Sequence, residues 1–382
     1  MSSDNPAPPS ISGKKEVPVL SPRALNRALL ARQMLLHRVE LPSLEIIERL
    51  AGLQAQSPSA PYFALWARLE GFNPEELSHL LQEKKAVRIA LMRSTIHLVS
   101  AEDCLSFRPV LQSVLDRSLQ GAFGKALAGL NLNELTSRGR ALVDEAPLTS
   151  QQLGQSLQVI YPEYEPSALA AAIRNSVPLV QLPPRGLWGK SGLAVHTTVE
   201  NWLGQPLSLA SSADQMVLRY LAAFGPASVK DIQVWSGLTR LSEALERLRP
   251  QLNTFRDEHG AELFDLPDAP RPDPNTPVPP RFLGEFDNML LSYADRTRIM
   301  DNSIQSRVCT KNGLVRSTFL LDGFVCGTWT IKVERGRALL RLEPFKPLTN
   351  QEKEALTEEG ARLLHFAAPN AKSHDIQFAA IT

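Results

Sequence analysis

The feature that most constrains the fold is an order of elements that returns three times, helical runs followed by residues typical of strands. The last cycle is the clearest, because helical runs at 215–224 and 228–238 are joined by the turn Gly225-Pro226. A third run follows at 240–250, and two strand-like segments flank His259-Gly260. A helix-turn-helix followed by a two-stranded wing is typical of a winged helix. The three cycles share an architecture and not a repeated sequence.

The first two cycles follow this order more loosely. Ser21-Pro22 has the composition of a helix start, and alternation over 86–100 indicates a two-stranded ribbon. Periodicity and flanking prolines predict further segments. These are helices at 23–36, 44–54, 75–84, 151–161 and 167–177, a strand at 178–182 and a loop at 183–192.

A different pattern begins after the proline-rich stretch at 268–280. Strands dominate it, with a hairpin signal at Asp322-Gly323 and one late amphipathic helix at 349–367. The predicted strands are 281–286, 288–294, 314–323, 325–333, 337–345 and 375–381.

These patterns predict an α+β fold of tandem winged-helix (helix-turn-helix) units followed by a β-rich C-terminal domain. Proline-rich and aperiodic segments mark the boundaries. We expect a disordered tail at 1–19, unit 1 at 20–110, connecting helices and unit 2 at 111–205, unit 3 at 206–267, a linker at 268–280 and the C-terminal domain at 281–382.

Composition excludes several classes of protein. Hydrophobic residues make up 43% of the chain, which suffices for a substantial core, and 41 basic residues are balanced by 40 acidic ones. Cys104, Cys309 and Cys326 are too far apart for a disulfide framework or a zinc motif. No apolar run reaches about 18 residues, and no secretory leader is visible. We therefore expect a cytoplasmic protein that needs no membrane, metal or cofactor.

Positive charge is concentrated locally although the chain is nearly neutral. Residues 84–101, 166–199 and 302–321 each contain three or more basic residues and no Asp or Glu. Each stretch lies on a predicted ribbon, wing or hairpin, and such elements can follow a phosphate backbone. Basic segments are also commonly solvated surface, and this alternative stays open.

Gln54 and Gln56 flank Ala55 at the predicted end of a helix, just before Ser57-Pro58. An amide cannot act as a strong base near neutral pH, but it can position a water and stabilise developing charge. Residues two apart do not face each other on a helix, so both amides converge only if the helix ends there, as the following proline favours. By residue type alone, they could equally be ordinary exposed residues at a helix end.

Other candidate DNA contacts lie on the predicted ribbons and loops. Arg93 and His97 could contact DNA from the first ribbon, or simply occupy an exposed strand face. Trp188 could insert into a groove, or anchor its loop on the core. Asp287 and Asp295 are the alternatives for a catalytic acid. The full set of candidate contacts is Arg93, His97, Arg185, Trp188, Lys190, Asn288, Arg296, Arg298 and Arg316.

Seven blocks of sequence, taken in order, resemble the winged-helix DNA glycosylases of the AlkZ/YcaQ type and span about residues 20–380. They are "LQAQSPSAPYFALWARL" (53–69), "LMRSTIHLVSAED" (91–103), "LVQLPPRGLWGKSG" (179–192), "ENWLG" (200–204), "RYLAAFGPASVKDIQVWSGL" (219–238), "FLGEFDNMLLSYADRTRI" (282–299) and "LLDGFVCGTW" (320–329).

The resemblance implies tandem winged helices around a concave, positively charged channel, with Gln54 and Gln56 as the catalytic residues. This chain is similar to the two-glutamine branch, whereas the other branch has an acid at the second position. The implied substrate is double-stranded DNA carrying N7-alkylated purines or interstrand crosslinks, and the implied enzyme is a monofunctional glycosylase without a catalytic lysine. We expect a monomer.

The substrate explains why two amides could suffice. Alkylation at N7 leaves a fixed positive charge on the purine, so the base departs without being protonated. The enzyme then has to stabilise an oxocarbenium-like sugar and place a water. Two rival hypotheses are a non-catalytic winged-helix DNA-binding protein, such as a transcriptional regulator, and an unrelated enzyme on the same scaffold.

Overall fold

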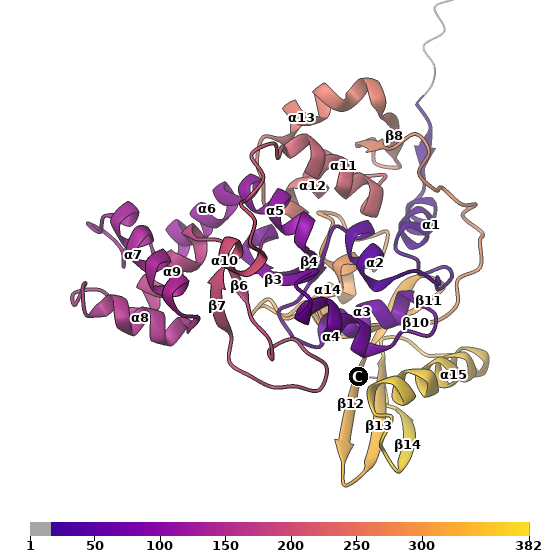
Figure 1. The fold of residues 1–382 in the computed structure, drawn as a ribbon. Coiled ribbons are helices and arrows are strands. Elements are labelled where there is room, and N and C mark those ends of the chain that lie inside the picture. Colours follow the sequence, from indigo (N-terminus) through magenta and orange to yellow (C-terminus); the bar gives the residue numbers. More distant parts are fainter. Residues whose placement is uncertain (1–16, 382) are drawn as a thin grey trace, which may run out of the picture.

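The computed structural model describes residues 17–381 (Figure 1). The N-terminal unit contains four helices and the ribbon expected at 86–100. Its elements are α1 (Pro22–Arg32), α2 (Ser43–Arg49), β2 (Leu53–Gln54), α3 (Ala60–Arg68), α4 (Pro74–Gln82), β3 (Ala86–Ala90), the 3-10 turn η1 (Met92–Ser94) and β4 (Ile96–Ser100). Helix α3 was not predicted, because prolines at its start and an apolar run without clear periodicity obscured it.

The middle of the chain adds helices on one side and strands that extend the same sheet. Its elements are α5 (Ala101–Val110), α6 (Gln112–Phe123), α7 (Leu132–Glu145), β5 (Leu148–Thr149), α8 (Ser150–Gln158), α9 (Pro166–Ser176), β6 (Leu179–Gln181), β7 (Val195–Thr198) and α10 (Val199–Leu203). The sheet order is β2-β4-β3-β6-β7-β5. Because β3 pairs with β6, the ribbons of the first two predicted units form one six-stranded sheet.

The third unit has the order of a winged helix, as the sequence predicted. Its elements are α11 (Ala213–Phe224), α12 (Val229–Ser236), α13 (Leu241–Leu248), the 3-10 turn η2 (Arg249–Gln251), β8 (Asn253–Asp257) and β9 (Glu262–Asp265). A short strand, β1 (Val19–Leu20), pairs with β8 in parallel. The predicted tail at 1–19 therefore contributes its last residue to a sheet, while residues 1–16 lie outside the described part of the chain.

The C-terminal part contains a five-stranded sheet of order β10-β11-β12-β13-β14. Its elements are β10 (Arg281–Leu283), the 3-10 turns η3 (Asn288–Leu290) and η4 (Asn302–Ile304), α14 (Gln305–Val308), β11 (Thr318–Leu321), β12 (Phe324–Glu334), β13 (Arg337–Pro344), α15 (Asn350–Ala367) and β14 (Ser373–Phe378). The hairpin at Asp322-Gly323 joins β11 to β12 as predicted.

One predicted strand of this part, 288–294, is absent, and η3 begins there instead. The side chain of Asp287 accepts a hydrogen bond from the backbone N–H of Met289, which caps a turn. An apolar run had suggested a strand, but a capping acid at its start favours helical geometry.

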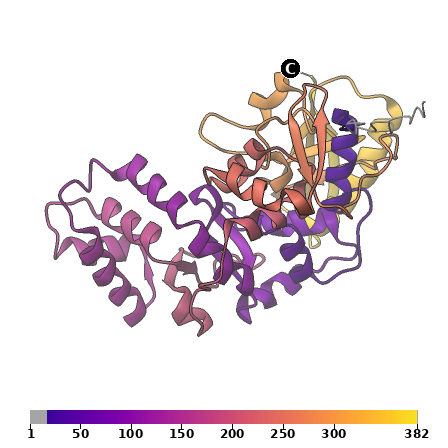
Figure 2. The ribbon, with the colours of Figure 1, turned by 90° about the horizontal axis from the view of Figure 1, so that it is seen from above.

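The core does not follow the predicted unit boundaries. One continuous hydrophobic cluster runs from Leu29 in α1 through α11 and α12 to Leu364 in α15. A second, smaller cluster is built mainly from α6–α9, which form one end of the molecule in Figure 2. The proline-rich linker lies along α1, where Arg27 donates to the carbonyl of Thr276. Within residues 17–381, no helix combines the length and apolar character needed to cross a membrane.

Candidate functional site

Gln54 lies in a short strand and not at the end of a helix. Helix α2 ends at Arg49, and Ala51 (φ 52°) and Gly52 (φ 91°) then turn the backbone sharply. A Cβ at Gly52 would lie 2.6 Å from Cγ1 of Val99, so this position requires glycine. The predicted helix 44–54 is therefore about five residues too long, and the strand β2 that follows pairs with β4.

The backbone of the Gln-Ala-Gln segment is held from several directions. Asn288 accepts from the N–H of Gln54 at 2.9 Å and donates to the carbonyl of Gly52. The N–H of Ala55 donates to the carbonyl of Ile96 at 2.7 Å. Asn288 is buried and anchors this segment to the C-terminal part of the chain, so it is a support and not the surface DNA contact that was predicted.

The two glutamine side chains are fixed by groups that can only donate. Oε1 of Gln54 accepts from Nη2 of Arg93 at 2.6 Å, and Oε1 of Gln56 accepts from the N–H of Ile96 at 3.2 Å. Gln54 is buried and Gln56 is exposed. Each amide therefore keeps its NH₂ group and one lone pair of its oxygen for other partners.

The surroundings of the pair are positively charged. Burial, and then the neighbouring charge of Arg296, lower the pKa of Arg93 to about 10. Burial, and then the charge of Arg93, lower the pKa of His97 to about 3, so its imidazole is neutral at pH 7. Within the part of the chain that the structure describes, no carboxylate contributes to either pKa.

Two predicted DNA contacts, His97 and Arg298, lie inside the protein. His97 is 1% exposed, and its Nδ1 lies 3.0 Å from the carbonyl oxygen of Thr95. Arg298 donates to the carbonyl of Pro226 at 2.7 Å and covers the ring of Tyr293 at 4.2 Å. Both side chains are buried and engaged within the protein, so the structure does not favour the predicted DNA contact of either residue.

The loop at 183–192 is anchored by its tryptophan. The ring of Trp188 packs against Tyr62 and Phe366, with centroids 4.9 and 5.2 Å apart. Arg185 braces the same loop by donating to the carbonyl of Gly192 at 2.9 Å. Of the two alternatives for Trp188, the structure thus supports the anchor, and Lys190 is the exposed charge at this loop.

The remaining predicted residues have differing surroundings. Arg316 is exposed, whereas Arg296 is partly buried and donates to Sγ of Cys309 at 3.2 Å. Nε of Arg296 is buried and has no hydrogen-bond partner among residues 17–381. Asp287 pairs with Arg68, and Asp295 accepts from the N–H of Thr297, so neither acid joins the hydrogen bonds around the glutamines.

Sequence reasoning did not single out Arg88 as a site residue, although it lies in the first acid-free stretch. Arg88 is 2% exposed and donates to the carbonyl of Ala55, between the two glutamines, at 2.8 Å. Burial, and then the charge of Arg185, lower its pKa to about 10. An arginine inside the apolar strand sequence "AVRIA" was the available signal, because such a residue needs a specific buried partner.

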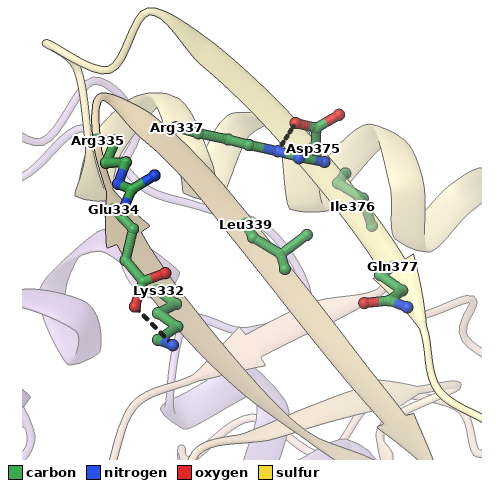
Figure 3. A pocket seen from close by; sticks show the side chains of 8 residues that line it. All are labelled: Lys332, Glu334, Arg335, Arg337, Leu339, Asp375, Ile376 and Gln377. Atoms are coloured by element: carbon green, nitrogen blue, oxygen red, sulfur yellow. Dashed lines mark hydrogen bonds and ion pairs between the residues drawn. The ribbon is translucent and has the colours of Figure 1, made fainter.

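A broad hollow lies on the C-terminal sheet (Figure 3), and neither Gln54 nor Gln56 is among the residues that line it. Lys332 pairs with Glu334 at 2.6 Å, and Arg337 pairs with Asp375 at 2.6 Å. Two carboxylates, Glu334 and Asp375, thus pair with two of its three cations, so this face is a weaker candidate for binding phosphate than the surroundings of Gln54.

Known proteins resemble this chain over most of its length. Residues 47–366 match the family model "DNA glycosylase AlkZ-like". The chain is 24% identical, over 354 residues, to an "Interstrand DNA cross-link repair glycosylase" of Streptomyces sahachiroi, covering 87% of this chain and 92% of that protein.

The fold also matches a solved structure, that of the DNA glycosylase AlkZ of Streptomyces sahachiroi. The TM-score is 0.77 at 19% identity, and the match covers 94% of this chain and all of that one. The family consists of DNA glycosylases, which are hydrolases acting on N-glycosyl bonds, so the comparisons favour an enzyme over a transcriptional regulator. Together, the family match over most of the chain and the shared fold show that this protein belongs to the AlkZ-like DNA glycosylase family.

Proposed function

We propose that this protein hydrolyses the N-glycosidic bond of N7-alkylated purines in duplex DNA and also unhooks interstrand crosslinks formed through such bases. The observation that carries the proposal is the pair Gln54 and Gln56, held by donor-only partners in surroundings where no carboxylate contributes to the pKa of Arg93 or His97. A cationic base needs no proton to leave, so a site without an acid suits this substrate class. The cross-link repair glycosylase of Streptomyces sahachiroi supports the extension to crosslinks.

The exposed Gln56 is suited to position the attacking water. Among residues 17–381 its oxygen accepts one hydrogen bond, so the second lone pair can hold a water proton while the water approaches C1′. Its fixed dipole also stabilises positive charge on the sugar without reorganising. Bond cleavage releases the neutral alkylated purine, and the water oxygen forms the new bond to C1′ and loses a proton to solvent.

Exposed basic residues are suited to hold the DNA backbone. Lys190 and Arg316 are exposed on separate loops, and Arg296 adds a partly buried positive charge that lowers the pKa of Arg93. Guanidinium and ammonium groups contact phosphates without reading sequence. Because crosslinked bases cannot be swung fully out of a duplex, binding along the backbone suits this substrate better than a closed base pocket does.

The experiment incubates the protein with a duplex that contains one N7-methylguanine. The DNA is then treated with alkali, which cleaves the strand at abasic sites, or left untreated. The wild type is expected to yield strand breaks only after alkali, as a monofunctional glycosylase does. Gln54→Ala and Gln56→Ala should each lose about 100-fold in single-turnover rate, while DNA binding is retained. Gln112→Ala is the matched control. Gln112, at the start of α6, also accepts a hydrogen bond from an arginine, Arg108, at 2.6 Å, but it does not contact Gln54 or Gln56.

A duplex carrying an interstrand crosslink between N7 atoms, run on a denaturing gel, tests unhooking. Separation of the strands by the wild type and not by Gln54→Ala is expected. Absence of base release from both substrates would overturn the proposed function.

A further inference from the structure

Arg93 holds an unusual backbone position between the two strands of the first ribbon. Its φ is 55°, and Ser94 follows at φ 58°, so the turn η1 carries two non-glycine residues in the left-handed region. Such positions are strained and are retained only where surrounding contacts fix them. The backbone of Arg93 lies against Gly237, at the end of α12. A Cβ placed on Gly237 would lie 3.4 Å from the backbone N atom of Arg93. The turn is therefore clamped against the third unit.

The side chain of Arg93 joins Gln54 to that unit. Nη2 donates to Oε1 of Gln54 at 2.6 Å, and Nη1 donates to the carbonyl of Trp235 in α12. The charged group that shifts the pKa of Arg93 is another cation, Arg296. Among the described residues, no carboxylate forms an ion pair with Arg93. Arg93 is half-buried, and an arginine that loses hydration without gaining a carboxylate partner is costly, which indicates a purpose other than stability.

The bond fixes which way the Gln54 amide faces. A guanidinium has donors only, so it donates to the amide oxygen and would repel the NH₂ group of a flipped amide. The Trp235 carbonyl in turn holds the guanidinium in place. Gln54 therefore turns its Nε2 away from Arg93 in a defined orientation, whereas the exposed Gln56 is fixed by a backbone N–H.

We propose that Arg93 is a positioning residue that locks the Gln54 amide so that its Nε2 donates to an acceptor atom of the damaged nucleotide. This inference rests on the proposed function of the glutamine pair and deepens it. Gln54 and Gln56 then have different tasks, since Gln54 acts as a donor to the nucleotide and Gln56 as an acceptor for water. It also replaces the sequence-based prediction that Arg93 itself contacts DNA.

The chain offers a closely matched control in Arg108. Arg108 is 1% exposed, its pKa is lowered to about 10 by burial, and it donates to Oε1 of Gln112 at 2.6 Å and to the carbonyl of Asn175 at 3.0 Å. It thus has the same kinds of partner as Arg93, a glutamine oxygen and a backbone carbonyl, without contact to Gln54. If Arg93 only supported the fold, replacing it should change the rate of base release to the same degree as replacing Arg108.

The experiment measures single-turnover release of N7-methylguanine and, separately, the Kd for the same duplex, for Arg93→Met, Arg93→Lys and Arg108→Met. Rates are expressed per folded molecule, from unfolding curves. Arg93→Met is expected to lower the rate about 100-fold, as misplaced catalytic groups do, with Kd within threefold. Arg93→Lys should recover at least tenfold, because an ammonium still donates to Oε1. Arg108→Met should keep the wild-type rate.

Three outcomes would overturn the inference. They are an unchanged rate in Arg93→Met, a loss carried by Kd and not by rate, and an equal loss of rate in Arg108→Met. A loss carried by Kd would instead identify Arg93 as a phosphate contact. Failure of the proposed function is recognised separately, because the wild type itself would then release no base, or Gln54→Ala would retain the wild-type rate.

Discussion

Arg68 and Asp287 face each other as a fully buried ion pair, with Nη1 and Nη2 each 2.9 Å from a carboxylate oxygen. The pair ties α3 to the residue that precedes Asn288, and Arg68 also donates to Gln33 of the segment after α1. An acid held in this way supports the fold and has no free oxygen to offer a substrate.

Replacing Asp287 by Asn should therefore cost stability and not chemistry. Removing one partner leaves the buried charge of Arg68 without a counter-ion, for which about 3–5 kcal/mol of unfolding free energy is expected. Urea denaturation measures the loss, with the exposed Asp295→Asn as the control, expected within about 0.5 kcal/mol of the wild type. Wild-type stability combined with lost base release in Asp287→Asn would contradict this assignment.

A carboxylate should have different effects at the two glutamine positions. In Gln54→Glu the carboxylate forms an ion pair with Arg93 and has no N–H to present, so a loss of about 100-fold or more in single-turnover rate is expected. In Gln56→Glu one oxygen still accepts from Ile96 and the other is free for water, so the rate should stay within about tenfold. Comparing the two isosteric variants on one N7-methylguanine duplex makes the check, and the reverse ranking would refute it.

The turn before Gln54 should tolerate no side chain. Gly52→Ala combines a positive φ with a Cβ 2.6 Å from Val99, so an overpacking cost of about 1–3 kcal/mol adds to the backbone strain. Gly71→Ala is the control, because its φ of 63° carries the same kind of strain but its Cβ would meet open space. Chemical unfolding of both variants should show the larger loss in Gly52→Ala; equal losses would mean that the contact with Val99 relaxes freely.

Stability should fall as the solution is acidified below about pH 6.5. His97 has its pKa lowered to about 3 and His196 to about 4, in both cases chiefly by burial. Below the unfolded pKa of about 6.5, only the unfolded chain binds these protons, so stability is full above that value and is lost as the pH falls toward the folded pKa.

At pH 5.5 each histidine should lower the unfolding free energy by about 1.4 kcal/mol relative to pH 7.5. The amide of His97→Asn can replace Nδ1 beside the Thr95 carbonyl. In this variant the loss of unfolding free energy between pH 7.5 and pH 5.5 should be smaller by the contribution of one histidine, about 1.4 kcal/mol. Denaturation curves at the two pH values decide the matter. An unaltered difference in His97→Asn would show that His97 does not titrate in this way.

Exposed and buried basic residues should differ in their effect on DNA binding. Lys190→Ala and Arg316→Ala each remove an exposed charge, so each should reduce the slope of log K against log salt by about 0.9. Arg298→Met is the control, since its buried guanidinium holds the Pro226 carbonyl and should affect stability and not the slope. Binding titrations at several salt concentrations provide the measurement, and unchanged slopes in Lys190→Ala and Arg316→Ala would exclude these contacts.

Local patterns were sufficient to predict much of this fold. Capping residues and periodicity placed α11, α12 and α13 within a few residues, and the Asp322-Gly323 turn located a true hairpin. Long-range pairing was not predictable in this way. The junction of β3 with β6, and the packing of the linker along α1, depend on contacts that no short window contains.

The site illustrates the same limit. Gln54 and Gln56 were recognised by motif, but their setting was misjudged, because Gly52 was taken as part of a helix although its φ is 91°. Arg298 and His97 look like surface contacts by residue type and spacing. Only the fold reveals that Pro226 and Thr95 supply carbonyl partners inside the protein.

The clamp that Asn288 places on Gln54 spans 234 residues of sequence. A ribosome has to synthesise those residues after Gln54 before the support for its backbone exists, and the segment that carries Asn288 has to emerge and dock as well. Nascent chains, and chains shortened by premature termination or proteolysis before this point, lack the clamp. The backbone geometry of the candidate catalytic segment thus depends on a contact that can form only after most of the chain has been synthesised.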